Sequence, residues 1–442
     1  MKLIFEDRRD NGDDGDGRAS RGRAAARTPV VRAVAAGSVG NFVEWYEFGV
    51  YGYLATVLAD RFFTPAGRGA AEALVYTYAS FALAFFFRPL GAVLFGRLGD
   101  RIGRRPVLLV VIALMTAATT LIGVLPTYAT AGALAPWLLT FLRVLQGLSA
   151  GGEFGGAVAL LTEFAPPGRR GLYGAWQSFT VALGLLGGAG AAAATAALLS
   201  DPQLIHWGWR LPFLLALPLG LVALWLRAGL AETPEFRERE RAADPPGGAG
   251  PSAAAVLLGA ARVMGWSAAG YTFLVVLPSY LQATLHADVR QALLATVPAN
   301  AGFAAAILPA GLLSDRVGRR PVMLTGALLV IAFAVPLFDL LQDPGTTTAV
   351  KGLATGAAGV VIGLMAGPGP ALLAEMFPTR VRWTGLGLAY SLSNAVFSGC
   401  AGLIITEAVR RTGNVDVPAY YAAAACAVSA LALLKRPSCE RS

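Results

Sequence analysis

Three ionisable residues lie within long apolar stretches of the sequence, where a charge is costly. Glu44 and Glu47 belong to one stretch and Arg143 to another. A charged side chain at the centre of a membrane helix costs about 2.5 to 3.5 kcal/mol on insertion scales, so it needs a partner or a function. Two carboxylates three residues apart on a helix lie close together, which in a low dielectric favours protonation of one of them. The pair therefore predicts a proton-coupling site, and the alternative is that both carboxylates pair permanently with an arginine.

Residues at helical spacing from these three extend the predicted site. Asn41 lies one turn before Glu44, and Gln146 follows Arg143 by three residues on the same helical face. An arginine in a cavity can attract a carboxylate substrate or pair with a carboxylate that releases its proton, and the alternative is a fixed salt bridge to a glutamate. Glu153 fits the cavity and a gate equally well. Aromatic residues in membrane helices more often serve packing than binding. With that alternative left open, the further candidates to line the cavity are Tyr46, Gln177, Tyr271 and Tyr280.

The elements that must position these residues are membrane-spanning helices. Of the 442 residues, 55% are apolar and only 14% are charged, well below the proportion of charge in soluble domains. A spanning helix needs about 20 largely apolar residues. A window of that length predicts an all-α membrane protein with twelve transmembrane helices, over 33–58, 74–96, 105–125, 136–161, 172–199, 209–228, 255–283, 291–313, 320–341, 350–373, 383–408 and 417–434.

The Lys and Arg residues predict how these helices are oriented. Of the 36 basic residues, 26 fall in the two tails and the loops after even-numbered helices, and 7 fall in the other loops. Cytoplasmic loops carry such an excess, so both termini are predicted to be cytoplasmic, in the cell (inner) membrane. Because the charges sit in short loops between apolar stretches, the net charge of +9 does not indicate a nucleic-acid partner.

The sequence repeats itself across a polar interval at 230–254. GRLGDRIGRRPVLL at 96–109 returns as GLLSDRVGRRPVML at 311–324, and LLTEFAPPGRRG at 160–171 returns loosely as LLAEMFPTRVRW at 372–383. Parallel repeats of this kind are typical of transporters built from two halves of equal topology. The predicted domains are a disordered cytoplasmic tail at 1–32, a six-helix bundle at 33–229, a cytoplasmic linker at 230–254, a second six-helix bundle at 255–435 and a tail at 436–442.

The repeated loops place acidic residues at helix ends beside arginines. Ion pairs between such groups can hold the cytoplasmic face shut, and opening must break them. The alternative is that the arginines only fix the orientation of the chain. Arg88 is expected at the same interface, either extended toward water or within the gate. The predicted gate residues from this spacing are Asp100, Glu163, Arg169, Asp315, Arg319, Glu375 and Arg380.

Three motifs resemble a known family. The loop GRLGDRIGRRP is similar to the signature loop between helices two and three of the major facilitator superfamily. Within that superfamily, GNFVEWYEFGVYGYLA (40–55), FRPLGAVLFGRLGDRIGRR (87–105) and RVLQGLSAGGEFGGA (143–157) resemble the metabolite:proton symporters, which include carriers of proline and betaine, 2-oxoglutarate, citrate and shikimate. The resemblance covers 33–435 and implies alternating access around a central cavity between two bundles. It also implies a gating role for Gly96, Asp100 and Arg104.

Together these features predict a function. No GxxxxGK[ST] loop occurs, and neither histidine nor cysteine spacing suggests catalysis or a metal site, so we expect no enzyme activity, no cofactor and no ATP hydrolysis. We expect a monomeric secondary transporter that takes up a small polar metabolite, such as an organic acid or zwitterion, together with protons. The alternatives are proton-coupled efflux on the same fold, and a membrane receptor that does not transport.

Overall fold

The computed structural model describes residues 37–64, 69–102, 104–151, 158, 161–162, 165–228, 251–378 and 381–435. These residues form helices and short connections, with no strand among them. The tails, the linker at 230–250 and the predicted site residues Glu153, Glu163 and Arg380 lie outside the described residues. So do the side chains of Gly96, Asp100 and Arg104.

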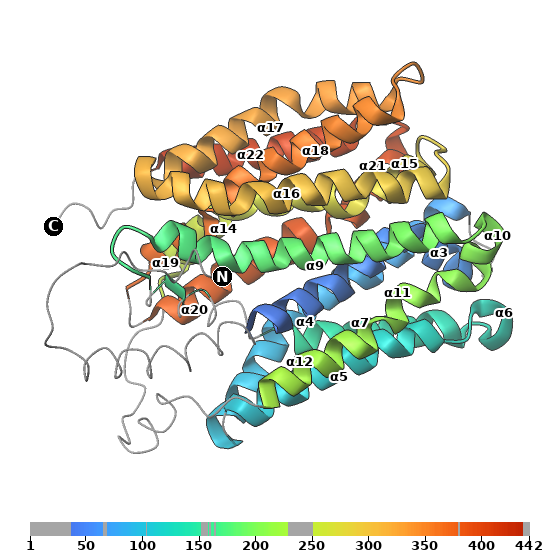
Figure 1. Cartoon of the computed structure of the whole chain (residues 1–442), viewed down its shortest axis with the longest axis horizontal. Helices are drawn as coiled ribbons and strands as arrows, with labels where there is room; N and C mark the ends of the chain where they lie inside the picture. Colours follow the sequence, from blue (N-terminus) through green and yellow to red (C-terminus); the bar gives the residue numbers. More distant parts are fainter. Residues whose placement is uncertain are drawn as a thin grey trace, which may run out of the picture.

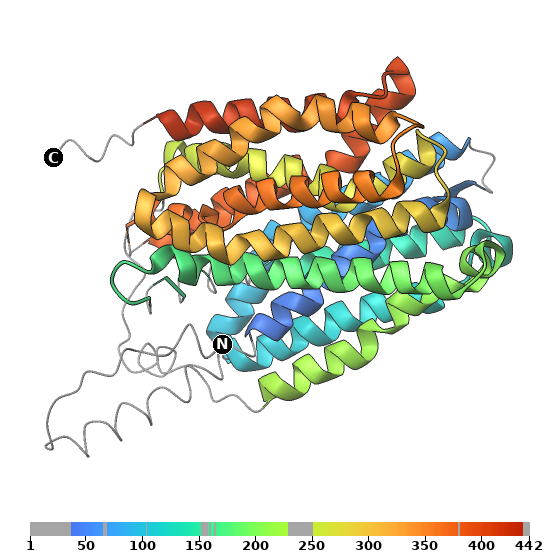
Figure 2. The same cartoon turned by 45° about the horizontal axis from the view of Figure 1, so that its top comes forward.

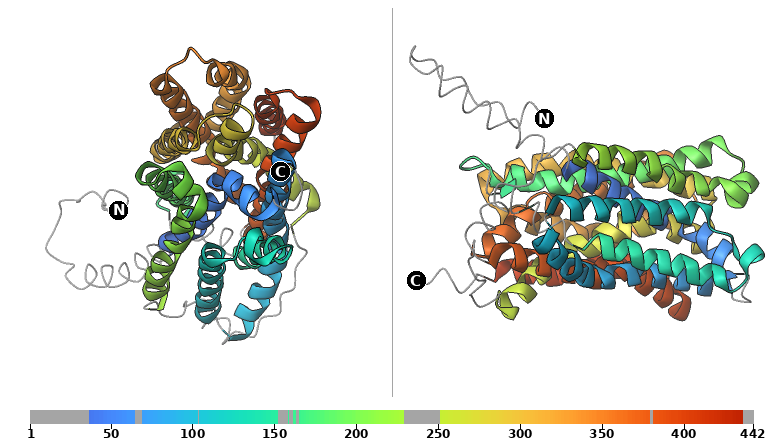
Figure 3. Two further views of the ribbon diagram at one scale, coloured as in Figure 1. Left: turned by 90° about the vertical axis from the view of Figure 1, so that its right-hand side faces the viewer. Right: turned by 90° about the horizontal axis from the view of Figure 1, so that it is seen from below.

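The N-terminal half begins with a helix over 37–53, here called the first helix, which continues through two short elements to residue 63. From Val43 on its apolar residues are buried, so this part lies inside the molecule, as the end-on view shows in blue (Figure 3, left). The elements that follow it in this half are α3 (Ala55–Leu58), the π-helical turn η1 (Ala59–Phe63), α4 (Ala70–Ile102), α5 (Arg104–Val124), α6 (Tyr128–Ala131), α7 (Leu134–Ser149), α9 (Arg170–Leu198), α10 (Asp201–Gln203), η3 (Leu204–Gly208), α11 (Arg210–Leu214) and α12 (Ala216–Ala228).

The C-terminal half has the same order of long helices, two of which are interrupted by π-helical turns. An extra residue in such a turn shifts the helical register, and these turns occur often at functional sites. The elements are α14 (Ala253–Tyr271), η4 (Thr272–Val276), α15 (Leu277–Ala283), α16 (Val289–Val317), α17 (Arg319–Gln342), α18 (Thr348–Ala366), α19 (Gly369–Met376), α20 (Arg382–Ser393), η6 (Asn394–Gly399), α21 (Ala401–Thr412) and α22 (Val417–Leu434).

The twelve predicted spans are confirmed. Ten helices of the described chain are long and apolar enough to cross a membrane, and α7 and the first helix complete the set. The largest difference is in α4, which ends at Ile102 whereas the apolar window ended at 96. The window follows hydropathy, but helical hydrogen bonding continues through the polar residues that leave the membrane. The described chain is thus an all-α membrane protein of two halves with the same order of long helices.

The two halves meet along α9 and α16, which run side by side in both Figure 1 and Figure 2. Small residues allow this approach: a Cβ atom on Gly311 would lie 2.5 Å from the Cβ of Ala175. Similar contacts join the halves elsewhere, since a Cβ on Gly52 would lie 2.3 Å from a methyl group of Val275 and one on Gly402 would lie 2.2 Å from the ring of Tyr78. Glycines at helix interfaces are typical of membrane proteins, because lipid supplies no hydrophobic force between helices.

All twelve spans run between two ends of the molecule. The end at which α4 and α16 finish and α9 and α20 begin is here called the basic end, and it lies at the left of Figure 1. The opposite end, here called the far end, carries the connections at 125–133, 199–209, 284–288, 343–347 and 413–416.

Candidate functional site

Arg88 of α4 pairs with Glu44 of the first helix inside the molecule. The Nη2 atom of Arg88 lies 3.3 Å from Oε1 of Glu44, and the two side chains are 7% and 11% exposed. The guanidinium carbon lies 4.4 Å from the ring centroids of both Phe48 and Phe85. The predicted position of Arg88 at the interface is therefore wrong. Because α4 continues to Ile102, Arg88 lies 14 residues, or about 21 Å, from the end of its helix.

Arg143 of α7 is completely buried among aromatic rings. Its guanidinium carbon lies 4.2 Å from the ring centroid of Tyr51, 4.8 Å from that of Phe81 and 5.0 Å from that of Phe48. Its Nη1 donates a hydrogen bond of 2.6 Å to Oε1 of Gln146. No carboxylate of the described residues lies within ion-pair distance of Arg143, so the alternative of a fixed salt bridge does not hold there.

Glu47 reaches Arg143 indirectly, through two neutral side chains. The carboxyl group is completely buried, and its Oε2 accepts a hydrogen bond of 2.6 Å from the hydroxyl of Thr119 on α5. Nε2 of Gln146 donates to the same hydroxyl oxygen, also at 2.6 Å. Sequence reasoning missed Thr119, because three threonines of the same apolar stretch look alike until the rotation of the helix is known.

Tyr271 of α14 brings the C-terminal half into this site. Its ring lies 5.7 Å from that of Phe85 and 6.1 Å from that of Phe81, and the side chain is buried. The two arginines are thus enclosed by one set of rings, here called the aromatic cluster, which consists of Trp45, Phe48, Tyr51, Phe81, Phe85 and Tyr271. The predicted residues Glu44, Glu47, Arg143, Gln146 and Tyr271 therefore lie together.

Several buried polar atoms of this site have no hydrogen-bond partner among the described residues. They are Nε and Nη2 of Arg88, Nε and Nη2 of Arg143, the hydroxyl of Tyr271 and Oε1 of Glu47. Apart from the ion pair of Arg88 with Glu44, the two guanidinium groups therefore hold unused donors. Unpaired buried polar atoms are rare in native proteins, and each requires an explanation.

The other predicted cavity residues lie elsewhere. Gln177 of α9 donates a hydrogen bond of 3.0 Å to Oδ1 of Asn41, which joins the first helix to α9. The hydroxyl of Tyr46 donates to the carbonyl of Pro212 at 2.7 Å. At the far end, the hydroxyl of Tyr280 donates to the carbonyl of Val415 at 2.9 Å. The structure does not bring these four residues to the arginines, because helical spacing alone did not reveal which face of each helix turns inward.

A pocket lies beside Glu44 within the N-terminal half, between the first helix, α5 and α7. Its empty volume is about 280 Å³. The residues that line it are Gly40, Val43, Glu44, Val111, Ile112, Met115, Thr116, Ser149 and Ala150. Most of them belong to the parts of these helices nearer the basic end, so the pocket extends from Glu44 toward that end.

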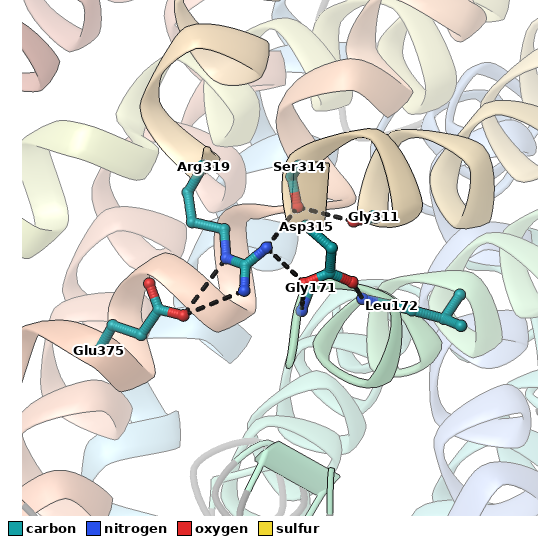
Figure 4. A network of polar contacts seen from close by, with 7 residues as sticks. All are labelled: Gly171, Leu172, Gly311, Ser314, Asp315, Arg319 and Glu375. Atoms are coloured by element: carbon teal, nitrogen blue, oxygen red, sulfur yellow. Dashed lines mark hydrogen bonds and ion pairs between the residues drawn. The ribbon is translucent and has the colours of Figure 1, made fainter. Parts of the chain in front are cut away.

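At the basic end, a network of ion pairs and hydrogen bonds crosses from one half to the other (Figure 4). Asp315 of α16 accepts hydrogen bonds from the backbone N–H groups of Gly171, at 2.7 Å, and Leu172, at 2.9 Å. These N–H groups open α9, where the helix dipole favours a negative charge. Arg319 donates to Asp315 at 2.6 Å and pairs with Glu375 at 3.2 Å. Three predicted gate residues are thus in contact. Arg169, the remaining predicted gate residue whose side chain the structure describes, is exposed directly before α9.

Comparisons with known proteins agree with this architecture. The family model described as "Sugar (and other) transporter" matches residues 33–243 and 252–441. The chain is 34% identical over 404 residues to the proline/betaine transporter of Salmonella typhimurium, a match that covers 88% of this chain and 80% of that protein. It is 33% identical over 436 residues to the citrate-proton symporter of Klebsiella pneumoniae, covering 94% and 96% of the two chains.

A solved structure gives the same picture of the fold. The crystal structure of a D-xylose-proton symporter matches with a TM-score of 0.73 at 20% identity, covering 92% of this chain and 98% of that one. The likeness extends over both halves.

Proposed function

We propose that this chain, which belongs to the sugar (and other) transporter family of the major facilitator superfamily, is a carrier of a small metabolite. The metabolite bears a carboxylate and crosses the membrane together with protons. The chain is a secondary transporter and not an enzyme. Two of its relatives carry proline or betaine and citrate, and each of these molecules bears a carboxylate.

The observation that carries this proposal is the pair of buried arginines with unused donors. Nε of Arg88, Nε and Nη2 of Arg143 and the hydroxyl of Tyr271 have no hydrogen-bond partner in the described part of the chain, and Nη2 of Arg88 has only its ion pair with Glu44. A substrate carboxylate can accept from such groups, and arginine–carboxylate bonds are about twice as strong as neutral hydrogen bonds. The aromatic cluster completes the site by covering the apolar or cationic remainder of a small metabolite. An organic acid and a zwitterion both fit this chemistry.

Glu47 is the proposed proton carrier. It is the buried carboxyl group without an ion-pair partner among the described residues, and burying an unpaired charge is expensive. Glu44 pairs with Arg88 and offsets the positive charge of that arginine, which lowers the net positive charge of the site. The pocket beside Glu44 supports a route by which protons are released toward the basic end.

The network at the basic end is the proposed gate, and we place that end in the cytoplasm of the cell, at its inner membrane. Asp315, Arg319 and Glu375 join α16, α17 and α19 to the start of α9. These contacts must break when the halves separate at this end, so they bias the equilibrium between the two open states.

Uptake into proteoliposomes tests the proposal. Labelled citrate, L-proline and glycine betaine are supplied with an inward pH gradient, an inward sodium gradient or neither. Accumulation of at least one of them should require the pH gradient. Glu47→Gln, which keeps the size of the side chain and removes its titratable proton, should lower this accumulation about tenfold or more, because a tenfold loss needs only about 1.4 kcal/mol.

The matched control is Glu72→Gln, at the far-end start of α4, where a half-buried acidic group distant from the site changes in the same way. Accumulation that follows sodium, or that is indifferent to both gradients, would contradict proton coupling. Transport of none of the three compounds would contradict the proposed class of substrate.

A further inference from the structure

The hydroxyl of Thr119 lies where it can form a hydrogen bond with Glu47 in both protonation states of that carboxyl group. Its oxygen lies 2.6 Å from Oε2 of Glu47, 2.6 Å from Nε2 of Gln146 and 3.0 Å from the carbonyl oxygen of Met115. A hydroxyl has one hydrogen to donate and two lone pairs that accept. The single hydrogen cannot serve both Glu47 and Met115 at the same time, so these distances describe two alternative arrangements.

In the first arrangement Glu47 is ionised. The hydrogen of Thr119 points to the carboxylate, and Gln146 donates to the hydroxyl oxygen. In the second arrangement Glu47 is protonated. The carboxyl O–H then donates to Thr119, Gln146 donates to the other lone pair, and the hydrogen of Thr119 turns to the carbonyl of Met115. In both arrangements the hydroxyl of Thr119 donates its hydrogen to one acceptor and accepts from Gln146, and only its O–H bond rotates between them.

Gln146 links this switch to the substrate site. While its Nε2 holds Thr119, its Oε1 accepts from Nη1 of Arg143 at 2.6 Å. Arg143 is therefore held by a neutral side chain and not by the carboxylate. In a direct ion pair, the carboxylate of Glu47 would be held in its ionised form. The donors of Arg143 would then be occupied by Glu47 and would not bind the substrate.

We propose that Thr119 is a positioning residue for proton coupling, which lets the buried Glu47 gain and lose its proton without movement of heavy atoms and which, through Gln146, keeps Arg143 available to the substrate. This inference rests on the proposed role of Glu47. It adds a residue on α5, a helix that carries none of the charged groups of the site.

The test compares Thr119→Val, Thr119→Ser and Thr120→Val. Valine has nearly the shape of threonine without the hydroxyl, and serine restores the hydroxyl. Thr120 is the matched control, because its hydroxyl donates to the carbonyl of Thr116 in its own helix. Two quantities are measured for each variant: pH-gradient-driven accumulation of labelled citrate, L-proline or glycine betaine, and exchange of the same compound across the membrane at equal pH.

Net accumulation requires Glu47 to release its proton, whereas exchange can proceed with the proton in place. Thr119→Val should therefore lower accumulation about tenfold, as expected for loss of a hydrogen bond to a charged group, and should lower exchange much less. Thr119→Ser and Thr120→Val should resemble the wild-type protein. Equal losses in accumulation and exchange for Thr119→Val would overturn the proposal, since they would indicate a role in packing alone.

Infrared spectroscopy of the purified full chain provides a measurement that needs no substrate. The carboxyl band that disappears in Glu47→Gln identifies protonated Glu47. In Thr119→Val this band should move to higher frequency, because its O–H group has lost an acceptor, and in Thr119→Ser it should return. An unmoved band would overturn the contact between Thr119 and Glu47. A wild-type protein that ignores the pH gradient in transport would instead contradict the proposed function, so the two failures are distinguishable.

Discussion

At the scale of single residues, the site depends on arginines whose geometry a lysine does not reproduce. Arg143 lies against the rings of Tyr51 and Phe81 and donates through one arm to Gln146, which leaves other N–H groups directed elsewhere. A guanidinium is planar and presents five donors in a fixed fork, whereas an ammonium is a compact point charge. The charge alone therefore does not define the site.

Arg143→Lys should raise the KM for substrate uptake about tenfold, since the positive charge remains but the planar stacking and the fork are lost. The matched control is Arg316→Lys, an exposed position near the basic end where KM should be unchanged. Initial rates of uptake into proteoliposomes over a range of substrate concentrations give both values. An unchanged KM in Arg143→Lys would show that the guanidinium fork does not contact the substrate.

The chemistry of these residues could be predicted from the sequence, but their pairing could not. Glu44, Glu47 and Arg143 stand out because they are charged in apolar stretches. The partners of each depend on how far a helix is rotated and where it crosses its neighbour. For this reason Arg88 was misplaced and Thr119 was not recognised, although both lie in predicted spans.

At the scale of the helices, the start of α9 is held by a residue from the other half. The carboxylate of Asp315 accepts from two N–H groups that have no partner within α9 itself, and Arg319 neutralises part of its charge. The sequence predicted that Asp315 belongs to a gate, but the repeat did not reveal that its carboxylate accepts hydrogen bonds from the N–H groups of a helix terminus across the interface. The π-helical turns η4 and η6 were not predicted either, because hydropathy does not register one extra residue in a turn.

Asp315→Asn should shift the protein toward the state that is open at the basic end. The amide keeps the shape of the side chain but loses the charge that favours the start of α9 and the pairing with Arg319. Such a charge at a helix terminus contributes about 0.3 to 2 kcal/mol, which is enough to change the ratio of two states severalfold. Distances between spin labels at Pro167 and Arg316, in a protein without native cysteines, should show a larger fraction of long separations.

The matched control is Asp343→Asn at the far end. Hydrogen bonds from the hydroxyl of Thr346 and the N–H of Gly345 lower the pKa of Asp343, so this substitution also removes one negative charge at neutral pH. It should leave the label distances at the basic end unchanged. An equal shift in both variants would mean that net charge, and not the contact with α9, sets the equilibrium.

At the scale of the whole molecule, the two ends differ in charge, and this difference predicts how the protein lies in the membrane. Arg97, Arg105, Arg169, Arg316 and Arg320 lie at or near the basic end. Twelve spans and two halves of equal topology could be predicted because they depend on apolarity and repetition alone. The close fit of one half to the other depends on side-chain shape and could not.

The basic end should face the cytoplasm. A cysteine introduced at Thr130, an exposed position of the far end, should react in intact cells with a maleimide that does not cross membranes. A cysteine at Arg169 should react only after the cells are broken open. The native cysteines are first replaced, and the opposite pattern of labelling would reverse the proposed direction of the gate.

The glycine contacts between the halves have a consequence for leakage. At Gly311, Gly52 and Gly402 the helices approach so closely that a Cβ atom would not fit, so we expect no file of water molecules along which ions could pass the substrate at these points. The same contacts interlock few side chains, and little has to be disentangled when the surfaces part. These glycines are therefore expected both to limit ion leakage and to let the two halves separate easily.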